Sequence, residues 1–191
     1  MDHDLDNIHP VHLWPTSLFL SQLSLDNTAM INELYNLERI DKDISKSNYG
    51  GWQSNIRLFE NNIFDSLKEK IVSHIHAIFQ KDNIEFKQMW GCINRHKDFN
   101  TVHSHGNEYH LSGVYYLKVP ENSGAIAFRD PRPAAISSST HSLFGFGDTE
   151  LFTPVANMLI LFPSYLEHFV LPNESKDYRM SISFDIRFGD L

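Results

Sequence analysis

The segment Arg179-Met180-Ser181-Ile182-Ser183-Phe184-Asp185-Ile186-Arg187-Phe188 alternates between polar and apolar residues along its whole length. Successive side chains of an extended chain point to opposite sides, so this pattern predicts a β-strand with two unlike faces. The apolar face should pack on a core and consists of Met180, Ile182, Phe184 and Ile186. The polar face either meets water or lines a ligand pocket inside a barrel, and consists of Arg179, Ser181, Ser183 and Asp185.

The same two-residue period begins upstream, at Ile84, and recurs in short segments. Runs rich in Pro, Asn and Gly separate these segments, as expected of turns. The expected strands lie at about 84–92, 109–119, 125–128, 142–146, 158–162 and 179–188. Short strands with regular turn signals predict a jelly-roll barrel or sandwich.

Nearer the N-terminus the apolar period changes to that of a helix. Ser24 to Asp43 and Asn61 to Lys81 each carry apolar residues at helical spacing, and Ser24, Asp26 or Asn27 can cap the first helix. Helices followed by strands predict an α+β, mainly β chain. We expect helical support over about 24–81, a β core over about 84–188, and a single domain over 1–191.

Length, net charge and cysteine content argue against several classes of protein. The 191 residues suffice for a substantial core, and a net charge of −8 argues against broad nucleic-acid binding. No apolar stretch approaches the roughly 18 residues of a membrane span, and the acidic N-terminus lacks the features of a secretory signal. Cys92 is the only cysteine, so a reducing cytoplasm is the expected location.

His103-Ser104-His105 stands just before the strand predicted at 109–119. Residues i and i+2 of an extended chain share a face, so both imidazoles can reach one metal ion. Imidazole suits iron, copper, zinc and nickel. With His168 downstream and Arg179 as a two-pronged donor for a carboxylate, the pattern predicts a metal site with an acidic small-molecule partner.

Several blocks of the sequence occur in an order that resembles a known family. They are Asn94 to Asn100, His103 to His105, Leu111 to Leu117, Gly124 to Arg132, Phe162 to His168 and Tyr178 to Phe184, with Leu13 to Thr16 as an opening block. The chain thereby resembles the uncharacterised 2-oxoglutarate/Fe(II)-dependent oxygenases, a family similar to the prolyl hydroxylase branch. The resemblance covers most of residues 86–188 and implies a double-stranded β-helix core.

The resemblance also implies an activity and roles for individual residues. The activity is that of a non-haem Fe(II) dioxygenase that uses O₂ and 2-oxoglutarate, releases succinate and CO₂, and hydroxylates a peptidyl or small-molecule substrate. His103 and His168 occupy metal positions. Arg179, with Ser181, corresponds to the residue that pairs with the far carboxylate of 2-oxoglutarate, where Tyr116 donates a hydrogen bond and Asn94 approaches the same pocket. An ordinary ion pair of Arg179 with Asp185 or Glu167 is the alternative.

His105 departs from the superfamily pattern, which has Asp or Glu two residues after the first histidine. We favour iron ligation by His103, His105 and His168, because all-histidine iron sites occur in other oxygenases. Two histidines with water in the third place, or Glu108 as the third ligand, are alternatives. An all-histidine site also fits a cupin-like dioxygenase that does not use 2-oxoglutarate, and a jelly-roll binding or assembly module is the non-enzymatic alternative.

Overall fold

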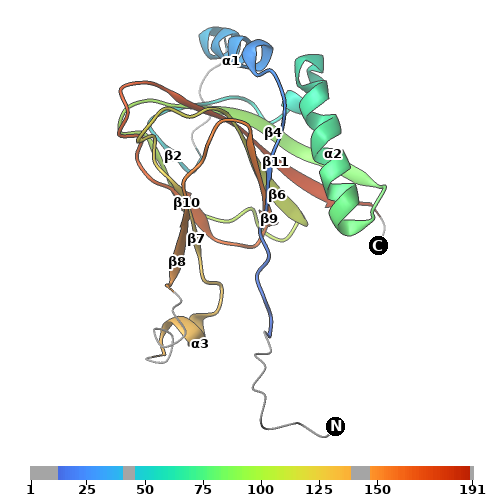
Figure 1. Cartoon of the computed structure of the whole chain (residues 1–191), viewed down its shortest axis with the longest axis vertical. Coiled ribbons are helices and arrows are strands. Elements are labelled where there is room, and N and C mark those ends of the chain that lie inside the picture. The colour runs from blue at the N-terminus through green and yellow to red at the C-terminus, as the bar shows by residue number, and fades with distance from the viewer. Residues whose placement is uncertain (1–12, 41–45, 139–146, 190–191) are drawn as a thin grey trace, which may run out of the picture.

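Two antiparallel sheets form the body of the protein (Figure 1). The computed structural model describes residues 13–40, 46–138 and 147–189. One sheet has the strand order β1-β9-β6-β11-β4-β3, and the other has the order β2-β5-β10-β7-β8. The strands are β1 Phe19–Gln22, β2 Asn48–Tyr49, β3 Trp52–Gln53, β4 Ile84–Asn94, β5 Phe99–His103, β6 Leu111–Lys118, β7 Ile126–Arg129, β8 Thr149–Phe152, β9 Met158–Pro163, β10 His168–Val170 and β11 Arg179–Phe188.

The alternating segment that ends the sequence is β11, which lies between β6 and β4 in the six-stranded sheet. Its pairing with β4 sets Arg179 opposite Asn94 and Phe188 opposite Ile84. All of its predicted apolar face is fully buried, and this face belongs to the main hydrophobic core. The polar face is turned to the inside of the molecule, since Arg179 and Asp185 are each only 1% exposed. The alternative of a pocket-lining face is therefore correct.

The helices are α1 Thr28–Ile40, α2 Asp65–Phe79 and the short α3 Pro133–Ile136, with 3-10 turns at Leu58–Glu60 and Asn62–Phe64. The helices α1 and α2 cover the outer side of the six-stranded sheet, whereas α3 lies beyond the ends of β7 and β8 (Figure 1). Leu34 of α1 and Ile71 of α2 are fully buried in the same core as β11. The absence of a side chain at Gly91 lets α1 approach β4, because a Cβ there would lie 2.4 Å from a Leu34 methyl carbon.

The ends of both helices follow from local chemistry. The Asp26 carboxylate accepts a hydrogen bond from the Thr28 backbone N–H at 2.9 Å, which fixes the start of α1 four residues after the predicted Ser24. The predicted end of this helix, 41–43, lies outside the described residues. The 3-10 turn Asn62–Phe64 precedes α2, and the left-handed Gln80, with φ of 53°, ends it.

A second, smaller core lies between the two sheets. It consists of Val114, Tyr116, Ile126, Phe128, Ile160, Phe162 and Leu166. Two facing antiparallel sheets with helices outside one of them confirm the predicted mainly β, double-stranded β-helix architecture. The strand predicted at 142–146 lies outside the described residues.

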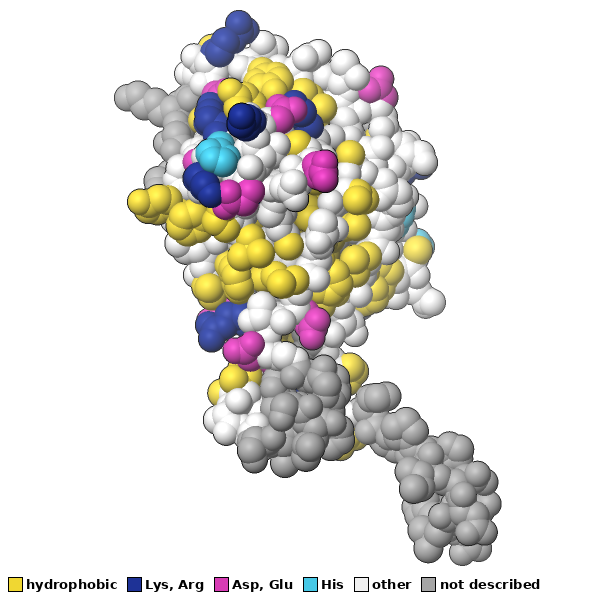
Figure 2. All heavy atoms as spheres, turned by 60° about the vertical axis from the view of Figure 1, so that its left-hand side comes forward, with side chains coloured by type: hydrophobic (Ala, Val, Ile, Leu, Met, Phe, Trp, Pro, Cys, Tyr) yellow, Lys and Arg dark blue, Asp and Glu magenta, His cyan; other side chains and the backbone are white. Residues whose placement is uncertain are grey.

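The outer side of the five-stranded sheet shows a band of hydrophobic side chains, with acidic and basic groups above it (Figure 2). Tyr49 of β2 and Leu151 of β8 are among the exposed hydrophobic residues of this sheet. None of the helices in the described part of the chain is both long enough and apolar enough to span a membrane.

Candidate metal centre

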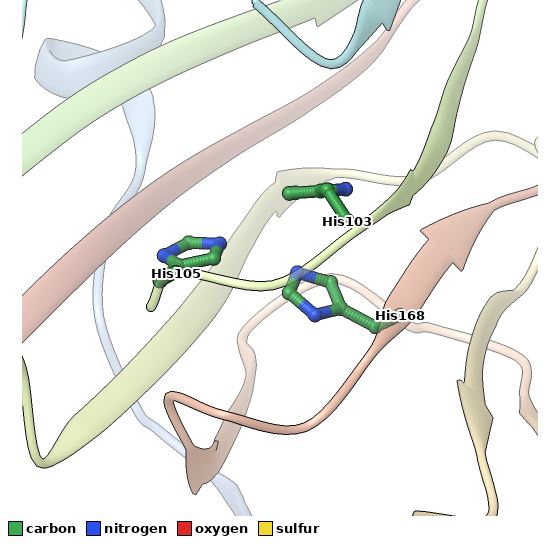
Figure 3. Close-up of side chains that lie close together, drawn as sticks. All are labelled: His103, His105 and His168. Carbon is green, nitrogen blue, oxygen red and sulfur yellow. The ribbon is translucent and has the colours of Figure 1, made fainter. Parts of the chain in front are cut away.

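His103, His105 and His168 lie together at one end of the space between the sheets (Figure 3). One ring nitrogen from each lies within 4.8 Å of those of the other two. The centroids of the His103 and His168 rings are 4.3 Å apart, and the His105 centroid is 5.1 Å from that of His168. Three nitrogen donors this close together can bind a single transition-metal ion.

Strand register brings these histidines together across 65 residues of sequence. β5 ends at His103, β10 begins at His168, and the two residues are directly opposite in the antiparallel pair. His105 lies just beyond β5, where its backbone N–H donates to the carbonyl of Ser164 at 2.9 Å. That bond ties the segment after β5 to the turn before β10 and keeps the third ring beside the other two.

Each of the three rings has an oxygen acceptor at its Nδ1 atom. His103 Nδ1 lies 2.7 Å from the carbonyl of Thr101, and His168 Nδ1 lies 2.9 Å from the carbonyl of Leu166. His105 Nδ1 lies 2.5 Å from a carboxylate oxygen of Asp185. Carbonyl and ionised carboxylate oxygens only accept, so each Nδ1 carries the proton. The lone pair of each neutral ring is then on Nε2, where it can bind a metal.

The environment also keeps two of these rings neutral. Burial and the neighbouring His103 ring lower the pKa of His168 to about 3. Burial lowers the pKa of His103 as well, with a smaller contribution from the His105 ring. A neutral imidazole is the form that coordinates metals, so neither ring has to lose a proton near pH 7 before binding one.

Arg179 lies at the other end of the same cavity and is 1% exposed. Its Nη1 donates to the carbonyl of Ser123, with the carbonyls of Gly124 and Leu171 each 3.4 Å away. Nη2 is buried and has no hydrogen-bond partner among the described residues. Arginine stays protonated in proteins, so this end of the cavity holds a cation with an unused donor.

The two acidic residues considered as ion-pair partners of Arg179 pair elsewhere. Asp185 contacts His105, and Glu167 forms an ion pair with Arg129 at 3.0 Å. None of the ion pairs among the described residues includes Arg179. The ordinary-ion-pair alternative for this arginine is therefore wrong.

Gly124 shapes the arginine end. Its φ of 85° is in the left-handed region, and a Cβ there would lie 2.4 Å from the Leu171 carbonyl oxygen and 3.0 Å from Arg179 Nη1. Only a residue without a side chain lets these groups approach so closely.

The other residues predicted for the pocket also line this cavity. They are Asn94, Tyr116 and Ser181, and all three are buried. Burial raises the pKa of Tyr116 to about 12, so its phenol stays protonated and can donate a hydrogen bond. The cavity is thus lined by three imidazoles, a guanidinium and neutral hydrogen-bonding groups.

Sequence reasoning did not assign a role at the metal site to Asp185, Ser112 or Trp90. Asp185 contacts His105 directly, Ser112 donates to Asp185, and the Trp90 ring centroid is 5.6 Å from that of His105. The polar alternation of β11 was the available signal for Asp185, since it shares a face with Arg179. Glu108, considered above as a third ligand, is not part of the histidine cluster and lines an adjoining groove.

That groove leads from the surface to the histidines. It includes His103 and His105, and its walls include Lys46, Gln53, Gln88, Trp90, Asn107 and Tyr109. His103 and His105 thus line both the groove and the cavity that contains Arg179, whereas His168 lines the cavity alone.

Comparison with known proteins gives a family match and several similar folds. The profile of the family described as "Putative 2OG-Fe(II) oxygenase" matches residues 88–185. No curated protein matches the chain.

Three solved structures illustrate the similar folds. The α-ketoglutarate-dependent epimerase SnoN from nogalamycin biosynthesis has a TM-score of 0.71 and 11% identity, over 91% of this chain and 77% of that chain. A prolyl-4-hydroxylase from Pseudomonas putida has a TM-score of 0.61 and 15% identity, over 92% of this chain and 94% of that chain. HygX from Streptomyces hygroscopicus, with nickel, 2-oxoglutarate and hygromycin B bound, has a TM-score of 0.64 and 10% identity, over 91% of this chain and 84% of that chain. At these identities the likeness is one of fold.

Proposed function

The chain belongs to the 2-oxoglutarate/Fe(II) oxygenase family, whose profile matches residues 88–185, and we propose that it is a 2-oxoglutarate-dependent hydroxylase. In this proposal His103, His105 and His168 hold Fe(II), and Arg179 binds the far carboxylate of 2-oxoglutarate. The observation that carries the proposal is that three clustered imidazoles and a buried guanidinium without an ion-pair partner among the described residues line one cavity.

The arginine end fits a dicarboxylate. A buried cation whose Nη2 lacks a partner is costly, and a carboxylate would both neutralise it and accept that hydrogen bond. Tyr116 is a protonated donor beside it, and Ser181 and Asn94 add neutral polar groups. These residues would bind the non-reacting end of 2-oxoglutarate and so orient its 2-oxo acid end toward the histidines.

The histidine end fits a divalent metal. Its donors are three imidazole rings, each fixed by a hydrogen bond at Nδ1, and imidazole is a good ligand for Fe(II). Because none of the three ligands is a carboxylate, they offset less of the ion's positive charge than the commoner triad with one carboxylate does, which favours an anionic cosubstrate. When bound, Fe(II) supplies the activation of O₂ and the oxidative decarboxylation of 2-oxoglutarate.

The net reaction consumes 2-oxoglutarate, O₂ and one C–H bond, and yields succinate, CO₂ and a hydroxylated product. The primary substrate, peptidyl or small-molecule, would approach through the groove that shares His103 and His105 with the cavity. Trp90 and Tyr109 offer aromatic surface in this groove, while Gln53 and Gln88 offer amide hydrogen bonds. The apolar residues between the sheets, such as Val114 and Phe162, keep water from the cavity.

Anaerobic titration of the Fe(II) protein with 2-oxoglutarate tests this function. We expect a visible metal-to-ligand charge-transfer band that saturates at one 2-oxoglutarate per iron. In Arg179→Ala the iron stoichiometry should persist while the affinity for 2-oxoglutarate falls by about 2 kcal/mol, or roughly 30-fold. The matched control is Arg57→Ala, at a guanidinium with 65% side-chain exposure, which should behave as the wild type.

The two alternatives give different results in the same experiment. Metal retained without 2-oxoglutarate binding in the wild type would favour a cupin-like dioxygenase. Absence of stoichiometric metal would favour a binding or assembly module. Succinate formation across a panel of peptides and small metabolites would then identify the primary substrate.

A further inference from the structure

Asp185 is a buried carboxylate that contacts the metal site through one histidine. It lies on the polar face of β11, is 1% exposed, and has an Oδ1 atom 2.5 Å from His105 Nδ1. His105 is itself well covered, with 9% side-chain exposure. Water therefore competes little with this contact.

Two serines hold the carboxylate in place. Ser112 Oγ lies 2.6 Å from Asp185 Oδ1, and Ser164 Oγ lies 3.0 Å from Ser112 Oγ. Because an ionised carboxylate only accepts, Ser112 donates to Asp185, and the single Ser112 proton leaves Ser164 as the donor to Ser112. The Ser164 carbonyl in turn accepts the His105 backbone N–H, which closes a ring of contacts around His105.

The three histidines differ in what their Nδ1 atoms contact. His103 and His168 donate to backbone carbonyls, which are neutral. His105 alone of the three donates to a carboxylate. His105 is also the histidine that stands where the superfamily has an acidic ligand. The negative charge at this place therefore belongs to Asp185, which contacts the ligand ring and not the metal position itself.

The charge of Asp185 is otherwise uncompensated. Among the described residues, the one partner of Asp185 at ion-pair distance is His105, whose ring is charged only if protonated, and no Lys or Arg pairs with it. A buried carboxylate without a cationic partner is unfavourable. A divalent ion bound to the other nitrogen of His105 would supply the opposite charge through the ring.

We propose that Asp185 is a positioning residue of the metal site, which holds His105 with Nε2 toward the metal and supplies the negative charge that the three-histidine ligand set lacks. This inference rests on the proposed metal site. Such carboxylate–histidine–metal arrangements orient the ring and raise the basicity of the ligand nitrogen.

Anaerobic Fe(II) titration of wild type and Asp185→Asn tests the proposal. We expect Asp185→Asn to weaken Fe(II) binding about 10–100-fold, the range for outer-sphere partners of metal ligands. The Fe(III)/Fe(II) reduction potential should also rise, because removal of a nearby negative charge disfavours the more positive ion. The matched control is Asp82→Asn, the same change at a side chain that is 90% exposed, and should alter neither quantity.

A double-mutant cycle separates this role from a merely structural one. In His105→Asp the ring that connects Asp185 to the metal is absent. Addition of Asp185→Asn to that variant should therefore weaken Fe(II) binding by much less than it does in the wild type. Equal weakening in both backgrounds, or an unchanged potential, would overturn the proposal.

If Asp185→Asn does not fold, the wild type still tests the inference. Side-chain ¹⁵N spectra of the Zn(II)-loaded protein should show His105 protonated at Nδ1 and bound to metal through Nε2, and the reverse arrangement would overturn it. Failure of the wild type to bind any metal would instead overturn the proposed site itself. Normal wild-type binding with an unaffected Asp185→Asn would overturn only the role of Asp185.

Discussion

The two faces of β11 are both largely buried but have different roles. Phe184 and its apolar neighbours pack against the helices and are fully buried. Arg179 and Asp185, on the opposite face, are just as inaccessible but carry charge. The side of β11 that is covered by helices therefore stabilises the fold. The side that faces the space between the sheets holds the charged groups of the candidate metal centre. Substitutions on the two sides should therefore separate stability from binding.

Phe184→Ala should have the largest effect in free energy. Phe184 is fully buried, packs on Gly113 and lies 5.8 Å from the Phe86 ring, so truncation leaves a cavity. We expect the free energy of unfolding to fall by about 3–5 kcal/mol, measured by denaturant titration. Ser183→Ala, next to it on the polar face, should cost under about 1 kcal/mol. Similar losses for both variants would contradict the division between the faces.

His168→Ala should have the next largest effect, and on metal binding. Substitution of an outer-sphere residue weakens metal affinity by up to roughly 100-fold, which corresponds to about 2.7 kcal/mol. Because His168 is a direct ligand in this account, we expect its loss to weaken Fe(II) affinity by more than that. Anaerobic metal titration measures it, with His76→Ala as the control because that side chain is 55% exposed on α2. Unchanged iron stoichiometry in His168→Ala would remove this residue from the ligand set.

Arg179→Ala should cost about 2 kcal/mol in 2-oxoglutarate affinity, at the lower end of the range for a buried charge pair. Its effect on the stability of the ligand-free protein should be small, since the substitution also removes a buried cation with an unsatisfied Nη2. Calorimetric titration and thermal unfolding measure the two quantities. A large loss of stability with unchanged 2-oxoglutarate affinity would make Arg179 a structural residue.

His105→Asp should have the smallest effect. An aspartate restores the commoner carboxylate ligand, so we expect iron to remain bound with an affinity within about tenfold, or 1.4 kcal/mol, of the wild type. Metal analysis after gel filtration checks this, and His105→Ala provides the comparison without a ligand. Loss of iron from a folded His105→Asp protein would argue against a simple exchange of ligands at this position.

Much of the fold could be predicted from local sequence patterns. The alternation of β11 and the helical spacing in α1 and α2 are properties of single segments, and the structure confirms all three. The short strands β5 and β10 were not predicted, because neither segment alternates between apolar and polar residues. They exist because each pairs with a neighbour that is distant in sequence.

The sequence allowed the residues of the candidate site to be predicted, but not most of the contacts between them. The structure brings His103, His105, His168 and Arg179 to one cavity, as the motifs indicated, while their ligand roles stay predictions. The partners at Nδ1 could not be predicted, because they depend on the register between distant strands. Asp185 is the main case: its position on the polar face was visible, but its hydrogen bond to His105, 80 residues away, was not.

A crystal structure of the protein with Ni(II) in place of Fe(II), and with 2-oxoglutarate, tests the central claim most directly. The account predicts one metal ion bound by the Nε2 atoms of His103, His105 and His168, and a far carboxylate of 2-oxoglutarate hydrogen-bonded to Arg179 Nη2. A metal bound without all three histidines, or 2-oxoglutarate held away from Arg179, would contradict it.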